Sequence, residues 1–352
     1  MNPFVTFQKG DPQVNAHLLG TFSATQFASP IAPFHTASGS TSITFEIKDR
    51  PITDGITKLK SIALLSKWNR LPWLWIPILM VFPSQNLHDV SAIAVFLAFF
   101  CITFFHLGIS LRNQVEDHLR GFDHFIANPT TLPFRLGWLT AQAAAQWSRI
   151  FLVIALISGC GTLIAEPATW PVALTAALLL GFYLLKKNFD LKYTFGSDRI
   201  QFFILGPLYF WGLHLLFQRH FGWFAAGQSV MWSFMYLQYF YLRALPHLLE
   251  AQKFGIQTLP AKWGFDKSKK FTEIWMTLTS IFLLMFGLLS MPLFIWPIGF
   301  LASTAFLIFS YRQFKRIDSP LSSTLTSLLR VNEYYLTFQL ALFTASHVWR
   351  LI

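Results

Sequence analysis

Long apolar runs alternate with short polar segments along most of this chain. A helix needs roughly 20 apolar residues to cross a bilayer, and the pattern predicts about nine such helices. The first run contains three prolines, so its ends are poorly defined by the sequence. The runs lie at about 71–85, 89–111, 138–163, 168–185, 200–218, 223–243, 272–290, 292–311 and 332–350. We therefore expect an all-α, polytopic membrane protein built as a bundle of these helices.

The composition agrees with this membrane assignment. Of 352 residues, 54% are hydrophobic, and the chain contains 39 Phe and 13 Trp. A soluble domain of this length does not need so much apolar surface. The chain is therefore expected to reside in the membrane, in contact with lipid.

Residues 1–60 differ from the rest of the chain. They are rich in Ser, Thr, Pro and Gly and contain one alternating run, Ser42–Ile47. So short a segment is too small for a core of its own, so we expect a polar cytoplasmic extension that packs loosely. A lid or a partner-binding strand is the alternative. Residues 61–352 are expected to form the transmembrane helical domain.

The distribution of basic residues indicates the orientation. With a cytoplasmic N-terminus, one side of the membrane carries 24 of the 27 Lys and Arg. Those residues lie in segments 1–70, 112–137, 186–199, 243–271 and 312–331. Such a bias predicts that the N-terminus and the long motif-bearing loops are cytoplasmic. The net charge of +11 is then explained by topology, and we expect no nucleic-acid partner.

An acidic segment, Asn113–Asp123, begins where the second apolar run ends. Asn113 and Asp117 are four residues apart and would share one helical face. Gly121 would let the chain turn and bring Asp123 toward Asp117. Carboxylate and amide oxygens are ligands that suit Mg²⁺ together with a substrate phosphate. A solvated charged loop is the alternative.

This segment resembles the first Asp-rich motif of the UbiA superfamily of intramembrane prenyltransferases, usually written N-D-x-x-D and followed by a further Asp. The wide spacing between Asp117 and Asp123 resembles the branch of dihydroxynaphthoate polyprenyltransferases in the menaquinone pathway. A P-x-R-x-x-G-like tail follows in that branch, and Pro133, Arg135 and Gly137 match it loosely. The resemblance implies that Arg135 binds a diphosphate.

Three further segments resemble the same family in the same order. Tyr183–Lys187 is similar to its Y-x-x-K-[KR] segment, which implies diphosphate contacts for Lys186 and Lys187. Gly196–Asp198 with Phe203–Leu208 resembles the lead into the fifth helix. Lys253–Gly264 is similar to the segment that follows the second Asp-rich motif.

The chain departs from the family pattern at two places. Gln114 replaces the leading Asp of the first motif, which removes a charge but keeps an oxygen ligand. In the second motif, His247 and Ala251 occupy the positions of the two aspartates, and Glu250 lies beside the second of them. We therefore expect one of the family's two Mg²⁺ sites to be weak or absent.

The residue assignments follow from the motif and from these departures. Asn113, Asp117 and Asp123 are the expected catalytic metal ligands, and Glu116, His247 and Glu250 are further candidates. The expected diphosphate-binding cations are Arg135, Lys186, Lys187, Arg243 and Lys253, because Lys and Arg bind phosphates without a metal.

The leading hypothesis is an Mg²⁺-dependent transferase that moves an isoprenyl group from its diphosphate to an aromatic or other small acceptor. A terpene cyclase of the same superfamily is the first alternative. A non-catalytic homologue that binds prenyl lipids or a partner is the second. The sequence leaves the acceptor, the prenyl length and the oligomeric state open.

Overall fold

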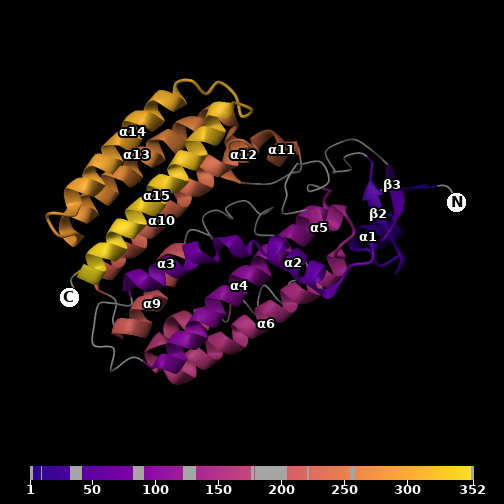
Figure 1. Ribbon diagram of the computed structural model, residues 1–352, viewed down its shortest axis with the longest axis horizontal. Coiled ribbons are helices and arrows are strands. Elements are labelled where there is room, and N and C mark those ends of the chain that lie inside the picture. The colour runs from indigo at the N-terminus through magenta and orange to yellow at the C-terminus, as the bar shows by residue number, and fades with distance from the viewer. Residues whose placement is uncertain are drawn as a thin grey trace.

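The computed structural model describes most of the chain as a bundle of long helices with a small sheet at one end (Figure 1). The described residues are 3–8, 10–31, 42–81, 91–121, 132–175, 178, 204–219, 222–253 and 258–349. The bundle helices are α3 (Leu71–Val81), α4 (Ala92–Leu119), α6 (Ala141–Ala165), α9 (Tyr209–Gln218), α10 (Trp223–Ala244), α13 (Phe265–Ser290), α14 (Trp296–Phe314) and α15 (Ser323–Trp349).

Short elements connect these helices. They are α2 (Gly55–Leu65), the 3-10 helix η2 (Trp68–Arg70), α5 (Leu132–Arg135), the 3-10 helix η6 (Pro167–Thr169), the π-helix η8 (Ile204–Leu208), α11 (Leu248–Lys253) and α12 (Leu259–Trp263). The prolines Pro72 and Pro77 fall within α3 without ending it.

The all-α membrane bundle expected from the apolar runs is confirmed. Helices occupy eight of the predicted runs, and half of the fourth, 168–185, lies outside the described residues. Among the described helices, α4, α6 and α13 are each long and apolar enough to cross a membrane. Three helices are longer than predicted: α4 continues to Leu119, α13 begins at Phe265, and α15 begins at Ser323.

The extension of α4 makes most of the acidic segment helical. The helix begins after Ser91, whose hydroxyl accepts a hydrogen bond from the Ala94 amide. It ends just before Gly121, which has the left-handed φ of 73°. The turn predicted at Gly121 is therefore present, and Asn113 and Asp117 lie one helical turn apart inside the helix.

Helices α4 and α6 pack closely against each other because small residues line their interface. A Cβ added to Gly108 would lie 2.8 Å from a side-chain carbon of Leu152. The Ser148 hydroxyl donates to the Gly108 carbonyl at 2.8 Å. Small residues and hydroxyl hydrogen bonds are typical of helix pairs inside membranes.

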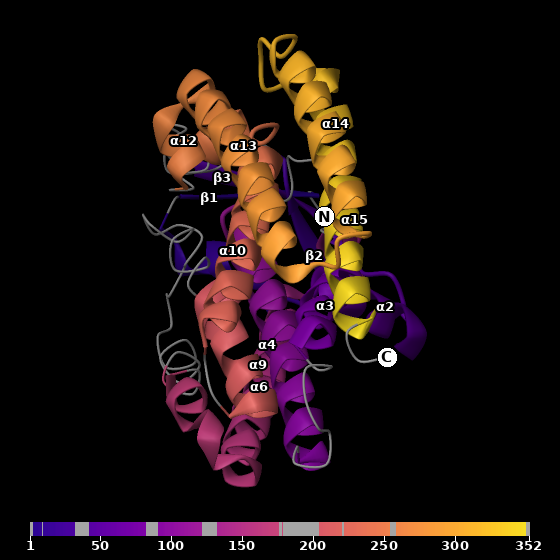
Figure 2. The same cartoon turned by 90° about the vertical axis from the view of Figure 1, so that its left-hand side faces the viewer.

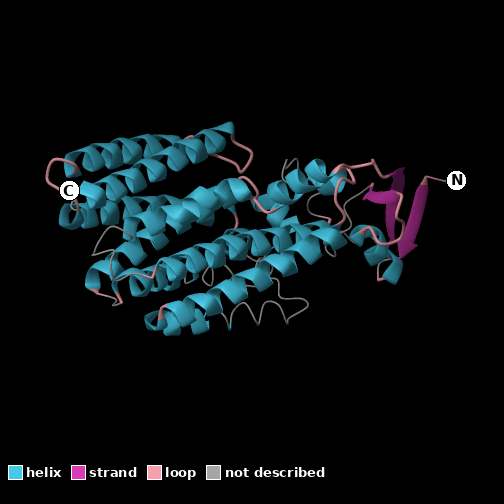
Figure 3. Cartoon of the chain, turned by 60° about the horizontal axis from the view of Figure 1, so that its bottom comes forward, coloured by secondary structure: helices cyan, strands magenta, loops and turns pink. Residues whose placement is uncertain are grey.

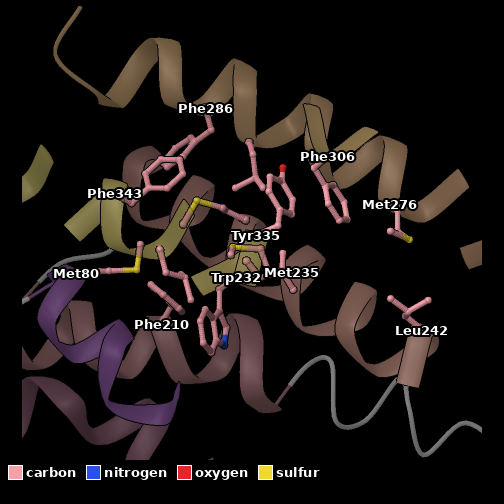
Figure 4. Close-up of a cluster of buried hydrophobic side chains, with 14 of the residues drawn as sticks. Met80, Phe210, Trp232, Met235, Leu242, Met276, Phe286, Phe306, Tyr335 and Phe343 are labelled. Atoms are coloured by element: carbon pink, nitrogen blue, oxygen red, sulfur yellow. The ribbon is translucent and has the colours of Figure 1, made fainter. Parts of the chain in front are cut away.

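The other half of the bundle is built by α10, α13, α14 and α15, with α3 and α9 packed against them. Their shared core contains Phe210, Met235, Phe306 and Tyr335 (Figure 4). The rings of Phe306 and Tyr335 stack with centroids 4.0 Å apart. Figure 1 and Figure 2 together show α14 and α15 running alongside each other and joined at one end. This packing fixes the directions of α10 and α15.

Residues 4–49 contain a folded unit, which we call the N-terminal unit. It consists of β1 (Phe4–Gln8), α1 (Pro12–Leu19), β2 (Gln26–Pro30) and β3 (Ser42–Asp49). The sheet is antiparallel in the order β1-β3-β2 and lies beyond one end of the bundle (Figure 3). Val5 pairs with Phe45, and Ala28 pairs with Ile47.

The loosely packed extension expected for this segment is not what the structure shows. Phe45 is fully buried in a small cluster with Val14, Leu18 and Ile43. The size argument fails because the unit does not complete its core alone. Leu119, at the end of α4, packs against the same cluster. The bundle therefore supplies apolar surface that so short a segment lacks.

Candidate functional site

The end of α4 carries the described part of the first Asp-rich motif. Asp117 is only 4% exposed, and Asn113 lies one turn before it on the same face. Burying a carboxylate in a largely apolar bundle is costly without a compensating partner. Gln114, which replaces the family's leading Asp, is also buried.

Glu116 lies on a different side of the helix from Asp117. Its carboxylate forms an ion pair with Arg112 one turn earlier, at 3.6 Å. This pairing already satisfies one charge of Glu116. Among the candidate metal ligands on α4, Asp117 is therefore the more buried and Asn113 its neighbour on the same face.

Arg135 occupies the last position of α5 and its side chain is exposed. The chain then turns at Gly137, which has a φ of 70°. This arrangement agrees with the predicted loop but gives Arg135 no buried anion-binding position. Asp123, Lys186 and Lys187 lie outside the described residues, and Lys253 is described only as the last backbone position of α11.

A cluster of cationic and aromatic side chains lies where α3 begins and α10 ends. Burial lowers the pKa of the Arg70 guanidinium, and the nearby positive charge of Arg243 lowers it further. The phenol groups of Tyr236 and Tyr239 and the carboxylate of Glu333 oppose that shift. Because arginine stays protonated in proteins, the cluster carries positive charge that an anion would stabilise.

Aromatic contacts position Arg243. The Arg243 guanidinium donates to the Tyr239 hydroxyl and lies 5.7 Å from the centroid of the same ring. The ring of Tyr239 also stacks with Trp73 of α3, with 6.2 Å between the ring centroids. The helix α3 is thereby tied to α10 beside the cations.

The positions of His106, Asn113 and Asp117 along α4 indicate which face of this helix is turned toward the cluster. His106 of α4 approaches the carbonyl of Lys67, with Nε2 at 3.5 Å, and Lys67 directly precedes η2. Asn113 and Asp117 follow His106 at i+7 and i+11 and therefore lie on the same face of α4. The motif face of α4 is thus turned toward the side on which Arg70 lies.

The remnant of the second motif is arranged differently. His247 and Glu250 pair with each other, with Nδ1 and Oε2 2.9 Å apart, and their side chains are 54% and 40% exposed. Within the part of the chain that the structure describes, no group of three or more His, Cys, Asp or Glu residues is arranged to hold a metal ion. Among the described residues, His247 and Glu250 therefore do not form a shared metal site with Asp117.

Arg70, Tyr236, Tyr239 and Glu333 were not identified from the sequence. Arg70 was counted only as one of the basic residues that indicate topology. Its position directly before the Pro-containing first helix was the available signal, because a cation at that point must enter the bundle or the interface. The two tyrosines and Glu333 carry no local signal, since they lie on two helices, α10 and α15, that are far apart in the sequence.

These features define an α-helical integral membrane protein with a buried carboxylate and an arginine cluster at the motif-bearing end of its bundle. The chain belongs to the UbiA prenyltransferase family, whose model matches residues 71–330. No curated protein sequence matches the chain in a direct comparison.

Solved structures show the same fold. A digeranylgeranylglyceryl phosphate synthase has 18% identity and a TM-score of 0.57, covering 83% of this chain and 99% of its own. A UbiA homologue from Archaeoglobus fulgidus, bound to GPP and Mg²⁺, has 17% identity and a TM-score of 0.55, covering 80% and 99%. The same homologue bound to Cd²⁺ has 14% identity and a TM-score of 0.52, again covering 80% and 99%. At these identities the likeness concerns the fold.

Proposed function

We propose that this protein is an integral membrane prenyltransferase that transfers an isoprenyl group from an isoprenyl diphosphate to a small acceptor. The observation that carries the proposal is the buried Asp117, on an α4 face turned toward the side of the Arg70–Arg243 pair. Family membership and the GPP- and Mg²⁺-bound homologue support this reading.

Mg²⁺ fits the residues of the first motif. Asp117 supplies a carboxylate and Asn113 an amide oxygen, and Mg²⁺ commonly takes one or two protein oxygens while substrate phosphates and water complete its shell. Asp123 is proposed as the second carboxylate. When bound, the ion would neutralise charge on the leaving diphosphate. The exposed and mutually paired His247 and Glu250 do not fit a second site of this kind.

The arginine pair would take over part of the role of the missing aspartates. Arg70 and Arg243 offer guanidinium forks that suit phosphate oxygens, and their mutual repulsion falls when an anion lies between them. Ionisation of an allylic diphosphate develops negative charge on the leaving group. Preorganised cations stabilise that charge. Arg135, Lys186, Lys187 and Lys253 remain proposed contributors.

The identity of the acceptor is a further part of the proposal. The first motif resembles that of the dihydroxynaphthoate branch, and this resemblance favours an aromatic acceptor of the dihydroxynaphthoate type, which would trap the allylic cation inside the bundle. Aromatic side chains such as Trp73 and Tyr239 would shield that cation through their ring faces. A cyclase would trap it with the double bonds of the substrate itself.

The test uses purified full-length protein in lipid nanodiscs with a labelled prenyl diphosphate and Mg²⁺. Reactions with and without an aromatic acceptor are compared by product analysis. The proposal expects a prenylated acceptor. A hydrocarbon product formed without an acceptor would show a cyclase and not a transferase. Absence of any product with every prenyl chain length and acceptor would favour a non-catalytic homologue.

The matched variants are Asp117→Asn and Lys58→Gln. Removing the Asp117 charge should lower kcat by about 10²–10³-fold, because charge stabilisation at the leaving group is lost. Lys58 is exposed on α2 and is not part of the motif, and its loss should leave the rate unchanged. Equal rates for wild type and Asp117→Asn would contradict the assigned role of Asp117.

A further inference from the structure

The N-terminal unit lies outside the residues that the family model matches, yet it contacts the helix that carries Asp117. His118 directly follows Asp117, is only 5% exposed, and reaches across to α1. Its Nε2 lies 3.0 Å from the carbonyl oxygen of Leu18. A carbonyl only accepts, so the imidazole must carry its proton on Nε2 and donate.

Apolar contacts accompany this hydrogen bond in both directions. Leu119 of α4 packs into the cluster of the N-terminal unit, beside Leu18 and Phe45. In return, Leu19 of α1 packs onto the bundle cluster that contains Leu111 and Val115. The N-terminal unit therefore contacts α4 at two successive residues, His118 and Leu119, which directly follow Asp117.

A second contact reaches the segment downstream of the motif. The ring of Phe27 in β2 lies against Gly137, where an added Cβ would be 2.7 Å from Phe27 Cδ1. Gly137 has a φ of 70°, so both the close approach and the turn require glycine. The unit thus contacts the chain on both sides of the segment that contains Asp123.

Arg50 cross-links parts of the N-terminal unit through hydrogen bonds. Its guanidinium donates to the carbonyls of Gly20 and Gln26, at 3.3 and 3.0 Å, and also to that of Ala24. These bonds join the end of α1 to β2 and to the end of β3. A unit that is cross-linked in this way can restrain the end of α4.

We propose that the N-terminal unit is a brace for the metal-binding end of α4 and that His118 is its positioning residue. The inference rests on the proposed function, since it assigns the brace to the diphosphate–Mg²⁺ site. The bond from His118 restrains the last turn of α4, where helices otherwise fray, and so restrains the Asp117 carboxylate. Loss of a group that orients a metal ligand typically lowers metal affinity or activity by about 10–100-fold. Because His118 contacts α1 and is assigned no contact with the substrate, we expect the loss in Mg²⁺ affinity.

The test compares His118→Leu with His118→Gln in full-length protein, because a Gln side chain can donate an N–H to the Leu18 carbonyl. The Mg²⁺ concentration for half-maximal activity should rise about tenfold in His118→Leu. The value of kcat at saturating Mg²⁺ should change little, and His118→Gln should restore most of the Mg²⁺ affinity. Phe27→Ala should shift the Mg²⁺ dependence in the same direction by a smaller factor. Lys48→Gln, on the exposed sheet, serves as the control and should behave as wild type.

Hydrogen exchange separates a failure of the brace from a failure of the proposed function. Amides of residues 113–121 should exchange faster in His118→Leu than in wild type or His118→Gln, whatever reaction the protein catalyses. If wild type consumes no prenyl diphosphate, the proposed function fails and this measurement still decides the brace. Unchanged exchange and unchanged Mg²⁺ dependence in His118→Leu would overturn the brace. A loss of kcat in both His118 variants at an unchanged Mg²⁺ dependence would overturn it as well.

Discussion

The role inferred for Arg70 differs between the sequence and the structure. In the sequence it is one of many cations on one side of the membrane. In the structure it is half-buried beside Arg243, with Tyr236, Tyr239 and Glu333 around it. Asp117, by contrast, was found from its motif, because the spacing of ligands along one helix is a local property. Residues that three helices bring together leave no such pattern.

The account predicts that Arg70→Gln weakens diphosphate binding. Loss of a charge-assisted hydrogen bond costs about 1.5–3 kcal/mol, so the KM for the prenyl diphosphate should rise by about 10–100-fold. Steady-state kinetics at saturating Mg²⁺ checks this result. Arg316→Gln removes an exposed cation from the loop between α14 and α15 and should leave KM unchanged. A KM equal to wild type in Arg70→Gln would remove Arg70 from the site.

At the scale of elements, the apolar runs predicted where most helices lie but not where they end. Apolar periodicity stops near Leu111, whereas α4 continues to Leu119 because the N-terminal unit and the cluster around Phe134 pack against its polar end. Tertiary contacts of this kind are not encoded in the local pattern. For the same reason the sheet was missed, since its core is completed by Leu119 from another element.

The interface between α10 and α15 contains a buried pair of amides. Gln238 and Asn332 are both fully buried, and the Gln238 Nε2 donates to the Asn332 Oδ1 at 2.5 Å. Among the residues that the structure describes, the remaining Gln238 Oε1 and Asn332 Nδ2 have no hydrogen-bond partner. Such a pair aligns the two helices but contributes little net stability, because two polar groups stay unsatisfied.

Asn332→Leu should therefore destabilise the bundle by about 1–3 kcal/mol, since it leaves the Gln238 amide without its partner. The double variant Gln238→Leu/Asn332→Leu should recover most of that loss. Reversible unfolding in detergent, or the Tm in the same detergent, measures both. Additive losses in the double variant would show that the two amides act independently.

At the scale of the whole molecule, the distribution of charge explains the expected orientation. Arg219 is an exception to the bias, because it follows α9 on the side expected to face away from the cytoplasm. It forms an ion pair with the buried Glu166 at 3.2 Å, so its charge is balanced within the protein. An exception that is neutralised in this way does not weaken the positive-inside prediction.

The orientation is tested by cysteine labelling in intact cells. In a background without Cys101 and Cys160, a membrane-impermeant maleimide should label Trp223→Cys, at the exposed start of α10. It should not label Lys48→Cys in the N-terminal unit until the cells are lysed. The reverse labelling pattern would invert the topology and place the motif-bearing end outside the cytoplasm.

The central claim is that the motif end of α4 and the arginine pair together ionise a prenyl diphosphate. The most direct measurement is release of inorganic diphosphate from a prenyl diphosphate by the reconstituted protein, across a Mg²⁺ titration. The account predicts Mg²⁺-dependent release that falls by about 10²–10³-fold in Asp117→Asn. Release that is independent of Mg²⁺, or equal in wild type and Asp117→Asn, would contradict it.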